Sequence, residues 1–381
     1  MNLKITQINN CIGCHACMNR CPVKAISMNE DKEGFLYPKV NENKCLQCGL
    51  CETICPALNM GETIKPLTIY AAKNNCDEER LKSSSGGIFP LLAKKIMEND
   101  GIVFGACFDE EWNVKHTYIQ RVEDISMLCG SKYVQSTIGN SYAAVEEFLK
   151  MGKIVLFTGT PCQIMGLKSF LQKEYSNLFT VDLACHGVPS PKVWRKYLAE
   201  ICPHNQIESI NFRDKRNSWS AFHITITEKT KKDVLSECYT KNNFMRGFIQ
   251  NLFLRPSCHQ CPAKQFKSKS DMTLGDFWGI QNFYPNFNDE KGVSVVFINT
   301  EKGKSLFDNL AVTTVETNYE KTISANYIVE KSVKMHPKRK VFFQLFNQEQ
   351  KSVNRIIEQL LYISYYMKIK NKMKQLLMKI L

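Results

Sequence analysis

The 381-residue sequence contains no run of about 18 consecutive apolar residues, so no membrane-spanning helix is expected. Its first ten residues, MNLKITQINN, lack the apolar stretch of a secretory signal peptide. Histidine is scarce, with 7 residues, whereas cysteine is abundant, with 17. Without a secretion signal we expect a cytoplasmic protein in a reducing environment, whose cysteines act as metal ligands rather than in disulfides.

The sequence also lacks a basic character that extends along the whole chain. The formal net charge is +13, but residues 331–381 hold 12 lysines and arginines against only Glu349 and Glu358. Because the excess is confined to the C-terminal end, it does not indicate a general nucleic-acid-binding surface. We therefore expect no nucleic-acid partner.

Two copies of one cysteine pattern occupy the first 56 residues. Each copy reads Cys-x-x-Cys-x-x-Cys-x-x-x-Cys-Pro, once over residues 11–22 and once over 45–56. In loops of this spacing three thiolates bind one 4Fe–4S cluster, and the fourth, before the proline, binds the other cluster. Zinc knuckles or a disulfide knot are alternatives that do not need the doubled Cys-Pro pattern. The predicted ligand sets are Cys11, Cys14, Cys17 and Cys55 for one cluster, and Cys45, Cys48, Cys51 and Cys21 for the other. These residues resemble a bacterial two-cluster ferredoxin domain.

Two strand–turn–helix units follow further along the chain. The apolar runs 153–157 and 178–184 are predicted strands, and a helical pattern follows each, the first from Ile164. This alternation indicates parallel α/β units. Cys162 and Cys185 come directly after the two strands, at the sheet edge where open α/β folds bind ligands.

A further pair, Cys258-x-x-Cys261, completes a possible set of four thiols with Cys162 and Cys185. Such a set would hold a third 4Fe–4S cluster or a zinc ion. Alternatively, Cys162 and Cys185 are small buried side chains, as free cysteines often are. The remaining cysteines have no paired spacing and are expected to be structural: Cys76, Cys107, Cys129, Cys202 and Cys238.

Two polar loops are candidates for binding an anion. Residues 83–87, SSSGG, precede a predicted helix that begins just after Gly87, and free N–H groups at a helix N-terminus suit a phosphate. An ordinary loop with a serine N-cap fits the same residues equally well. In the second loop, residues 130–136, Lys132 faces either an anion or solvent.

The C-terminal residues 353–381 carry apolar side chains at helical spacing with lysines between them. Such a segment could lie on an anionic membrane surface, dock on a partner, or pack as a terminal helix on its own domain. The pattern itself does not distinguish these alternatives.

Several motifs recur in one order between about residues 68 and 345. They are Ser85-Gly86-Gly87, Gly130 to Ser136, Gly159 to Gln163, Cys185-His186-Gly187, Cys258-x-x-Cys261 and Gly275-Asp276-Phe277-Trp278-Gly279. In this order they resemble the family of the beta subunits of coenzyme F420 hydrogenases and dehydrogenases. The resemblance implies a flavoprotein, with FAD close to an iron–sulfur cluster, but it does not say whether the deazaflavin coenzyme is used. It implies flavin contacts at Ser85, Gly86, Gly87, Ser131, Lys132, Tyr133, Thr160, Pro161 and Gln163, and cluster ligands at Cys162, Cys185, Cys258 and Cys261.

Together these features predict an α+β protein in three parts. They are a small ferredoxin-like domain over residues 1–60, a larger α/β flavin-binding domain with a partly parallel sheet over 68–345, and a basic helical tail over 346–381. The expected function is an oxidoreductase that passes electrons from 4Fe–4S clusters through a third cluster to FAD, and then to or from an organic acceptor. The alternative is a non-catalytic electron-transfer subunit that docks on a partner enzyme.

Three further expectations concern partners and protons. The electron donor is expected to be a ferredoxin or another redox partner protein, and the small-molecule acceptor is not identified. The basic tail makes a peripheral membrane contact possible. No acid–base residue is assigned, but His186 and His259, which adjoin proposed ligands, and Lys132 are candidates for handling protons.

Overall fold

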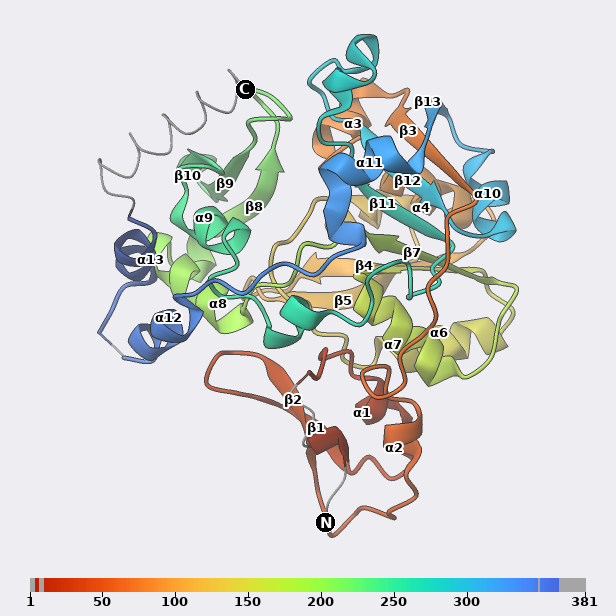
Figure 1. Ribbon diagram of the computed structural model, residues 1–381, viewed down its shortest axis with the longest axis vertical. Coiled ribbons are helices and arrows are strands. Elements are labelled where there is room, and N and C mark those ends of the chain that lie inside the picture. Colours follow the sequence, from red (N-terminus) through yellow and green to blue (C-terminus); the bar gives the residue numbers. More distant parts are fainter. Residues whose placement is uncertain (1–3, 7–9, 349, 363–381) are drawn as a thin grey trace.

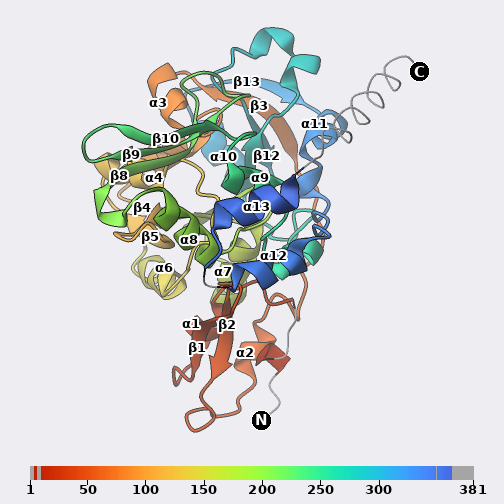
Figure 2. The same ribbon diagram turned by 90° about the vertical axis from the view of Figure 1, so that its left-hand side faces the viewer.

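The computed structural model describes residues 4–6, 10–348 and 350–362, which form a small N-terminal unit and a larger unit (Figure 1). In both views the small unit projects from the larger one next to helix α7 (Figures 1 and 2). Its only strands within the described residues form one antiparallel pair. The elements of the small unit are η1 (Lys4–Thr6), α1 (Ala16–Arg20), β1 (Ile26–Glu30), β2 (Leu36–Val40) and α2 (Leu50–Thr53).

The two cysteine loops of the small unit share one backbone conformation. In the first loop Gly13 and His15 have positive φ angles of 65° and 62°. In the second loop the equivalent residues, Gln47 and Gly49, have φ angles of 54° and 72°. Each loop therefore has one glycine and one larger residue in the left-handed region, but in the opposite order. The repeat in the sequence is thus also a repeat of backbone conformation, and α1 and α2 follow the two loops in the same way.

The larger unit is built on an eight-stranded sheet with the order β13-β3-β12-β11-β7-β6-β4-β5. The central strands β11, β7, β6 and β4 pair in parallel, and the outer pairs are antiparallel. The predicted α+β class with a partly parallel sheet is confirmed. The strands are β3 (Thr68–Asn74), β4 (Ile102–Phe108), β5 (Val114–Ile119), β6 (Val155–Gly159), β7 (Leu178–Leu183), β11 (Met272–Asp276), β12 (Ser294–Ile298) and β13 (Val312–Thr317).

Alternate residues of the central strands pack on opposite faces of this sheet, as the two-residue period of a strand requires. Val103 and Leu156 belong to a core with α4 and α10, whereas Phe104 and Phe157 belong to a core with α6 and α7. Both faces are therefore covered by helices (Figure 1). The helices of this unit are α3 (Asp77–Lys82), α4 (Ile88–Met97), α5 (Ile125–Leu128), α6 (Ser141–Lys150), α7 (Pro161–Leu171), α10 (Glu301–Phe307) and α11 (Tyr319–Asn326).

A second core lies beside the sheet, and we call this part the aromatic lobe. Trp194, Phe244 and Phe342, from three different helices, are completely buried in it. Helix α13 buries Ile356 and Ile357 in the same core, so the predicted helical periodicity is confirmed over this segment. Residues 363–381 of the predicted tail lie outside the described residues. The elements of the lobe are α8 (Pro191–Ile201), β8 (Ile207–Asp214), β9 (His223–Glu228), β10 (Asp233–Cys238), α9 (Asn243–Ile249), α12 (Arg339–Phe346) and α13 (Val353–Leu361).

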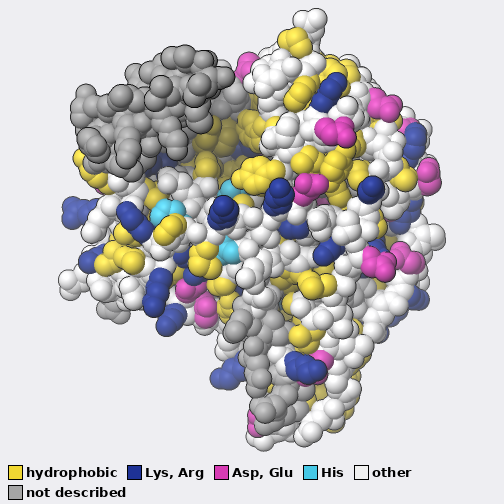
Figure 3. Space-filling model, viewed as in Figure 1, with side chains coloured by type: hydrophobic (Ala, Val, Ile, Leu, Met, Phe, Trp, Pro, Cys, Tyr) yellow, Lys and Arg dark blue, Asp and Glu magenta, His cyan; other side chains and the backbone are white. Residues whose placement is uncertain are grey.

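The distribution of charged side chains over one face of the molecule is shown in Figure 3. Basic and acidic side chains are interspersed over the part of this face that holds the sheet unit (Figure 3). Among the described residues, no helix has both the length and the apolar character needed to cross a membrane.

The small unit meets the larger one where Cys14 lies against α7. A Cβ atom at Gly166 would lie 2.7 Å from the Cβ of Cys14 and 2.7 Å from the hydroxyl oxygen of Tyr142. Both separations are shorter than van der Waals contact, so only glycine permits this approach. The Tyr142 hydroxyl also donates a 2.7 Å hydrogen bond to the carbonyl of Gln163, which fixes α6 to α7 beside the contact.

Replacing Gly166 with alanine is expected to destabilise the protein, although alanine favours a helix over glycine by about 1 kcal/mol. The added methyl group overlaps Cys14, and overpacking of this kind typically costs about 1–3 kcal/mol. The free energy of unfolding, measured with denaturant, should fall accordingly. Ser169→Ala on the same helix is the matched control and should be close to neutral. A Gly166→Ala protein as stable as the wild type would contradict the described contact.

Candidate functional site

The structure gathers four N-terminal thiols, which we call the inner site: Cys11, Cys14, Cys17 and Cys55. Burial raises the pKa of Cys14, and the thiols of Cys17, Cys11 and Cys55 raise it further. Burial, followed by Cys11 and Cys55, raises the pKa of Cys17 to about 12. These thiols are therefore close neighbours, and a bound cation would be needed to hold them together as thiolates.

The other four N-terminal cysteines line a small cavity at the far end of the small unit. We call this group the outer site: Cys21, Cys45, Cys48 and Cys51. Cys48 is exposed, and the neighbouring Leu46 is 65% exposed. The outer site is thus open to solvent, whereas Cys14 of the inner site is buried against α7.

Backbone amides donate to sulfur in both sites. Gly13 N–H donates to Cys11 Sγ over 3.4 Å, and Gln47 N–H donates to Cys45 Sγ over 3.4 Å. Ala25 N–H reaches Cys21 Sγ over 3.2 Å. Hydrogen bonds of this kind stabilise thiolate ligands and tune the potential of iron–sulfur clusters. The donor set therefore fits the two predicted clusters.

Four more thiols meet at the edge of the large sheet and form what we call the third site: Cys162, Cys185, Cys258 and Cys261. Cys162 lies in the first turn of α7, where the helix dipole favours a thiolate. The adjacent parallel strands β6 and β7 bring Cys185 to the same edge. Burial and the other three thiols, Cys261 first, raise the pKa of Cys162.

Of the CxxC pair of the third site, Cys258 lies in η4 (Pro256–Gln260) and Cys261 follows directly after it. Val188 N–H donates to Cys258 Sγ over 3.4 Å, and a Cβ atom at Gly187 would lie 3.3 Å from the Cβ of Cys258. The loop after β7 therefore packs directly on this pair. Among the described residues, no three Cys, His, Asp or Glu side chains converge closely enough to hold a single metal ion.

A cavity of about 520 Å³ adjoins the third site, and Cys185 forms part of its wall. Its walls come from the loops after β6, β7 and β11, from the 83–85 and 129–134 loops, and from the aromatic lobe. Cavities of about 300–1,000 Å³ are typical of cofactor sites. Of the residues implied to touch a flavin, those in the lining are Ser85, Gly87, Ser131, Lys132, Tyr133, Thr160 and Gln163.

Two of the implied flavin contacts, Gly86 and Pro161, are not part of this lining. Gly86 packs against the sheet, since a Cβ atom there would lie 2.4 Å from the carbonyl oxygen of Ala72. Pro161 occupies the first position of α7. Thr160 and Gln163 form a capping box at the same helix start, in addition to facing the cavity.

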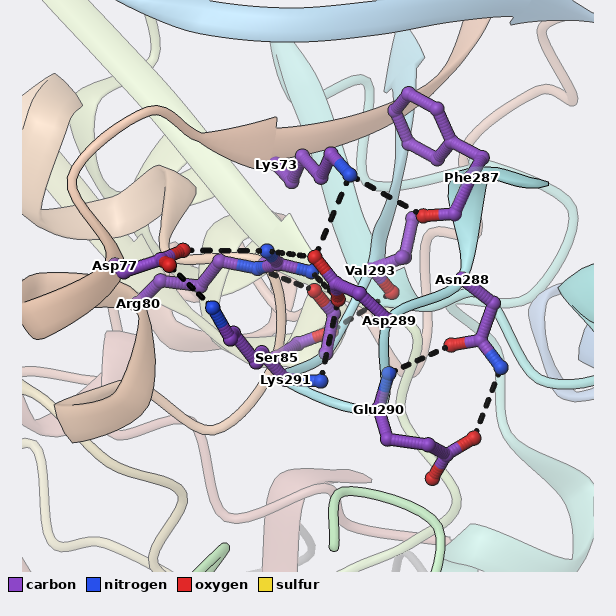
Figure 4. Close-up of polar contacts among 12 residues, drawn as sticks. Lys73, Asp77, Arg80, Ser85, Phe287, Asn288, Asp289, Glu290, Lys291 and Val293 are labelled. Carbon is purple, nitrogen blue, oxygen red and sulfur yellow. Dashed lines mark hydrogen bonds and ion pairs between the residues drawn. The ribbon is translucent and has the colours of Figure 1, made fainter.

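A dense polar network holds the serine–glycine loop in place (Figure 4). The buried Arg80 pairs with Asp289 and donates to the carbonyl of Gly292 over 2.8 Å. Ser85 Oγ donates to the carbonyl of Val293 over 3.0 Å. The loop is thereby fastened to the 289–293 segment, which lies more than 200 positions further along the sequence.

Lys215 completes the attachment of this loop from the aromatic lobe. Its Nζ donates to the carbonyls of Arg80, Ser85 and Lys291 over 2.6, 2.9 and 2.6 Å. Burial, followed by the neighbouring Arg213, lowers the pKa of Lys215 to about 7. One buried lysine thus joins three separate stretches of backbone.

Two of the proposed proton-handling residues lie in the cavity wall. Lys132 donates to the carbonyls of Cys129 and Gly130 over 2.9 and 3.1 Å, and burial lowers its pKa to about 8. His186 Nε2 lies 2.6 Å from Asn251 Oδ1, and burial lowers its pKa. His259, the third candidate, is not part of the lining and bonds the carbonyl of Val333 over 3.2 Å.

Two cavity residues have no counterpart among the residues expected from the sequence. Arg213 pairs with Asp276 through two 2.8 Å bonds and lies over the rings of Phe222 and Trp278. His116 lies 3.0 Å from the carbonyl of Thr158, and burial lowers its pKa to about 4, so its ring is neutral near pH 7. Neither belongs to a repeated or spaced motif.

Comparison with known families identifies both units. Residues 10–59 match the 4Fe–4S dicluster domain. Residues 152–321 match the family described as the C terminus of the coenzyme F420 hydrogenase/dehydrogenase beta subunit. The chain is a dicluster domain joined to a domain of this family. The resemblance expected from the sequence motifs is confirmed, and the two N-terminal cysteine loops are iron–sulfur loops. The chain therefore carries an iron–sulfur domain of the dicluster type.

The relatives that are named for an activity are oxidoreductases or their subunits. The chain is 24% identical to the coenzyme F420-dependent sulfite reductase of Methanocaldococcus jannaschii, over 78% of this chain but only 45% of that protein. It is 23% identical to a subunit of the F(420)H(2) dehydrogenase of Methanosarcina mazei, over 80% of this chain and 83% of the relative. A chain of the F420-reducing [NiFe] hydrogenase complex from Methanosarcina barkeri aligns with a TM-score of 0.47 at 17% identity, over 78% of this chain and 93% of that chain.

Changing Lys215 to methionine is expected to destabilise the protein, because one buried and two partly buried carbonyls lose their donor. An unpaired buried polar group costs about 1–3 kcal/mol, and the free energy of unfolding should fall by at least that much. Denaturant unfolding measures the change. Lys232→Met, at an exposed position between β9 and β10, is the control and should be close to neutral. Equal stability of the two variants would contradict the anchoring role of Lys215.

Proposed function

We propose that this chain is an iron–sulfur flavoprotein oxidoreductase. The inner and outer sites would each hold a 4Fe–4S cluster, the third site would hold another, and the cavity would hold FAD. When bound, the clusters supply one-electron transfer and the flavin supplies the exchange between single electrons and a hydride for an organic acceptor. The chain's own residues set the distances, the access and the local charge.

The position of the third site carries this proposal. Cys162 lies one helical turn before Gly166, which contacts Cys14 of the inner site. On its other side, the third site contributes Cys185 to the cavity wall. These two contacts support a third site between the inner site and the cavity, as an electron relay requires.

Several features of the cavity support FAD as its occupant. The anchored serine–glycine loop ends where α4 begins, at Gly87 with a φ of 77°, so the N-terminal amides of a ten-residue helix face the loop. Ser131 and Lys132 face the same space from the opposite loop. These groups would bind the diphosphate or another anionic part of the cofactor.

The electron donor would be a ferredoxin or a partner subunit, and it would approach the exposed outer site. Electrons could flow in either direction between this donor and an organic acceptor in the cavity. His186 and Lys132 are the residues that we propose for handling the accompanying proton, since both line the cavity. We further propose that the protein acts in the cytoplasm, where its thiols stay reduced.

A second function is favoured by the outer end of the small unit. Cys48 and the apolar side chain of Leu46 are exposed there, which suits transient docking on another protein. One relative is named as a subunit of an F(420)H(2) dehydrogenase. The chain could accordingly be an electron-transfer subunit that reduces no small molecule by itself.

The content of iron, sulfide and flavin per chain tests the two functions, in protein purified without oxygen. About twelve iron atoms, from three clusters of four, with one FAD would support the oxidoreductase. About eight iron atoms without flavin would exclude the relay to FAD and leave the docking subunit. Oxidation of a dithionite-reduced preparation by small acceptors then separates an enzyme from a subunit that needs its partner.

Changing Cys162 to serine is expected to remove one cluster and to leave the other two intact, because only the third site uses this thiol. Iron should fall by about four atoms per chain, and the electron paramagnetic resonance signals of the dicluster domain should persist. Cys202→Ser, at a buried cysteine outside the three sites, is the control and should retain all the iron. Unchanged iron in the Cys162→Ser protein would disprove the third cluster.

The affinity for FAD is expected to fall as the pH rises through the range above about 8. The pKa of Lys132, lowered to about 8 by burial, means that its charge is present below this pH and is lost above it. A bound anion would stabilise the protonated form of Lys132, so FAD binds most strongly at the pH values where this lysine is charged. Titration of the apoprotein with FAD measures this. Lys132→Gln should remove the pH dependence, whereas Lys39→Gln, exposed on β2, should keep it.

A further inference from the structure

Arg255 has an unusual position between the inner site and the third site. Its backbone belongs to the third site, since Arg255 N–H donates to the carbonyl of Val188 and its own carbonyl accepts from Cys258 N–H. Its side chain belongs to the inner site, because Nε donates to the carbonyl of Cys11 over 2.8 Å. A Cβ atom at Gly13 would lie 2.8 Å from Nη1, so the guanidinium lies directly against the inner cysteine loop.

This guanidinium is buried without a carboxylate. Arg255 is 1% exposed, and its other bonds go to the side-chain oxygen of Gln135 over 3.0 Å and to the carbonyl of Leu36 over 2.9 Å. The rings of Phe35 and Tyr37 lie 5.4 and 4.4 Å from it. Every one of these partners is neutral. Within the described residues, Arg255 takes part in no ion pair with an aspartate or glutamate.

The acidic residues of the nearby β1–β2 turn are engaged elsewhere. Glu33 pairs with Arg339 over 2.5 Å, and Asp31 accepts from the backbone N–H groups of Glu33 and Phe35. The other buried arginines of the larger unit are neutralised by carboxylates. Arg80, Arg213 and Arg339 each have a carboxylate partner. A buried charge without a partner is costly, so Arg255 needs a negative group that protein side chains do not provide.

A cluster held by the inner site would be that negative group. The negative charges of four thiolates exceed the positive charge of the iron–sulfur core, so the ligated cluster is negative overall. Reduction adds a further electron to the cluster. A fixed positive charge in a buried setting stabilises the reduced form more than the oxidised form, because water screens it little. Among the described residues, no buried arginine has a hydrogen bond to the outer site, and Cys48 of that site is exposed, so water screens nearby charges there.

We propose that Arg255 raises the reduction potential of the inner site and so favours the presence of the electron next to the third site. Arg255 is a positioning and tuning residue, and it contacts no reacting atom. The inference rests on the proposed function only in requiring that the inner site hold a cluster, which the dicluster family already indicates. A missing third cluster or a missing flavin would overturn the proposed function but would leave this inference open to test.

Two variants of the full-length, iron-loaded protein test the charge. Arg255→Gln removes it, and Gln135→Glu neutralises it with a carboxylate of nearly the same shape, placed where Arg255 already donates. Gln135 does not line the cavity. Midpoint potentials come from redox titration followed by electron paramagnetic resonance, after iron has been counted. In both variants the reduced-to-oxidised ratio of the inner site at fixed potential should fall at least tenfold, equivalent to about 59 mV for one electron.

Three controls make the result specific. Arg255→Lys keeps the charge while losing part of the hydrogen bonding. Its reduced-to-oxidised ratio at fixed potential should therefore stay within about threefold of the wild-type ratio, equivalent to about 30 mV for one electron. Arg195→Gln removes an arginine that also links the two units but is half-exposed and paired with Glu30, and it should shift neither site. The outer-site signal should stay constant in all variants and serves as an internal reference.

The contrary outcomes are equally definite. A full iron content with an inner-site ratio within twofold of the wild type, in either Arg255→Gln or Gln135→Glu, would overturn the proposal. If Arg255→Gln loses its iron, Gln135→Glu alone decides the question. Loss of iron in both variants would assign Arg255 a purely structural role and would also overturn it. A shift of equal size in Arg255→Lys would show that geometry, and not charge, sets the potential.

Discussion

The contact between α7 and the first cysteine loop is the constraint on which the rest of the arrangement depends. Helix α7 has Cys162 in its first turn and Gly166 four residues later, on the same side of the helix. With a rise of about 1.5 Å per residue, the two positions are about 6 Å apart along the axis. One short helix thus provides a thiol of the third site and the surface on which the inner site rests. Its direction follows from the parallel pair β6 and β7.

Buried charges fix the irregular parts of the molecule around this core. Arg80 with Asp289 attaches the serine–glycine loop, and Arg213 with Asp276 attaches β8 to the end of β11. Lys215 reaches the backbone carbonyls of Arg80 and Lys291, which are far apart in the sequence. Loops carry few apolar contacts, so strong charged hydrogen bonds take the place of packing there. The cavity is consequently shaped by fixed polar groups in its loops and by aromatic side chains on the lobe.

The parts of this structure that could be predicted from the sequence are those that follow from the spacing of residues along the chain. The doubled cysteine pattern is dictated by the geometry of a cluster, and the strands β6 and β7 by continuous apolar runs before helical periods. The helix start at Pro161 was missed by three residues, since the expected start was Ile164. Periodicity does not register a capping box, and Thr160 with Gln163 extends the helix beyond its apolar pattern.

The remaining site residues escaped prediction because their roles depend on distant partners. Arg255 is a single basic residue whose acceptors lie 244, 219 and 120 positions away. Lys215 reaches Arg80 across 135 positions. Gly86 belongs to the serine–glycine motif, but a glycine is required there because the carbonyl of Ala72 on β3 leaves no room for a Cβ atom. No local pattern encodes such contacts, which exist only after the sheet has formed.

The aromatic lobe has a consequence for how the chain is made. Its core joins α8 and α9 with α12 and α13, which are separated from them by a long stretch of sequence that includes the last strands of the large sheet. During synthesis from the N-terminus, α8 and α9 emerge well before the helices that cover their apolar sides. The lobe can close only after α12 and α13 have left the ribosome. Its side chains, Phe222, Tyr239 and Phe248 among them, form one wall of the cavity. The packing behind that wall is therefore complete only when α12 and α13 are in place.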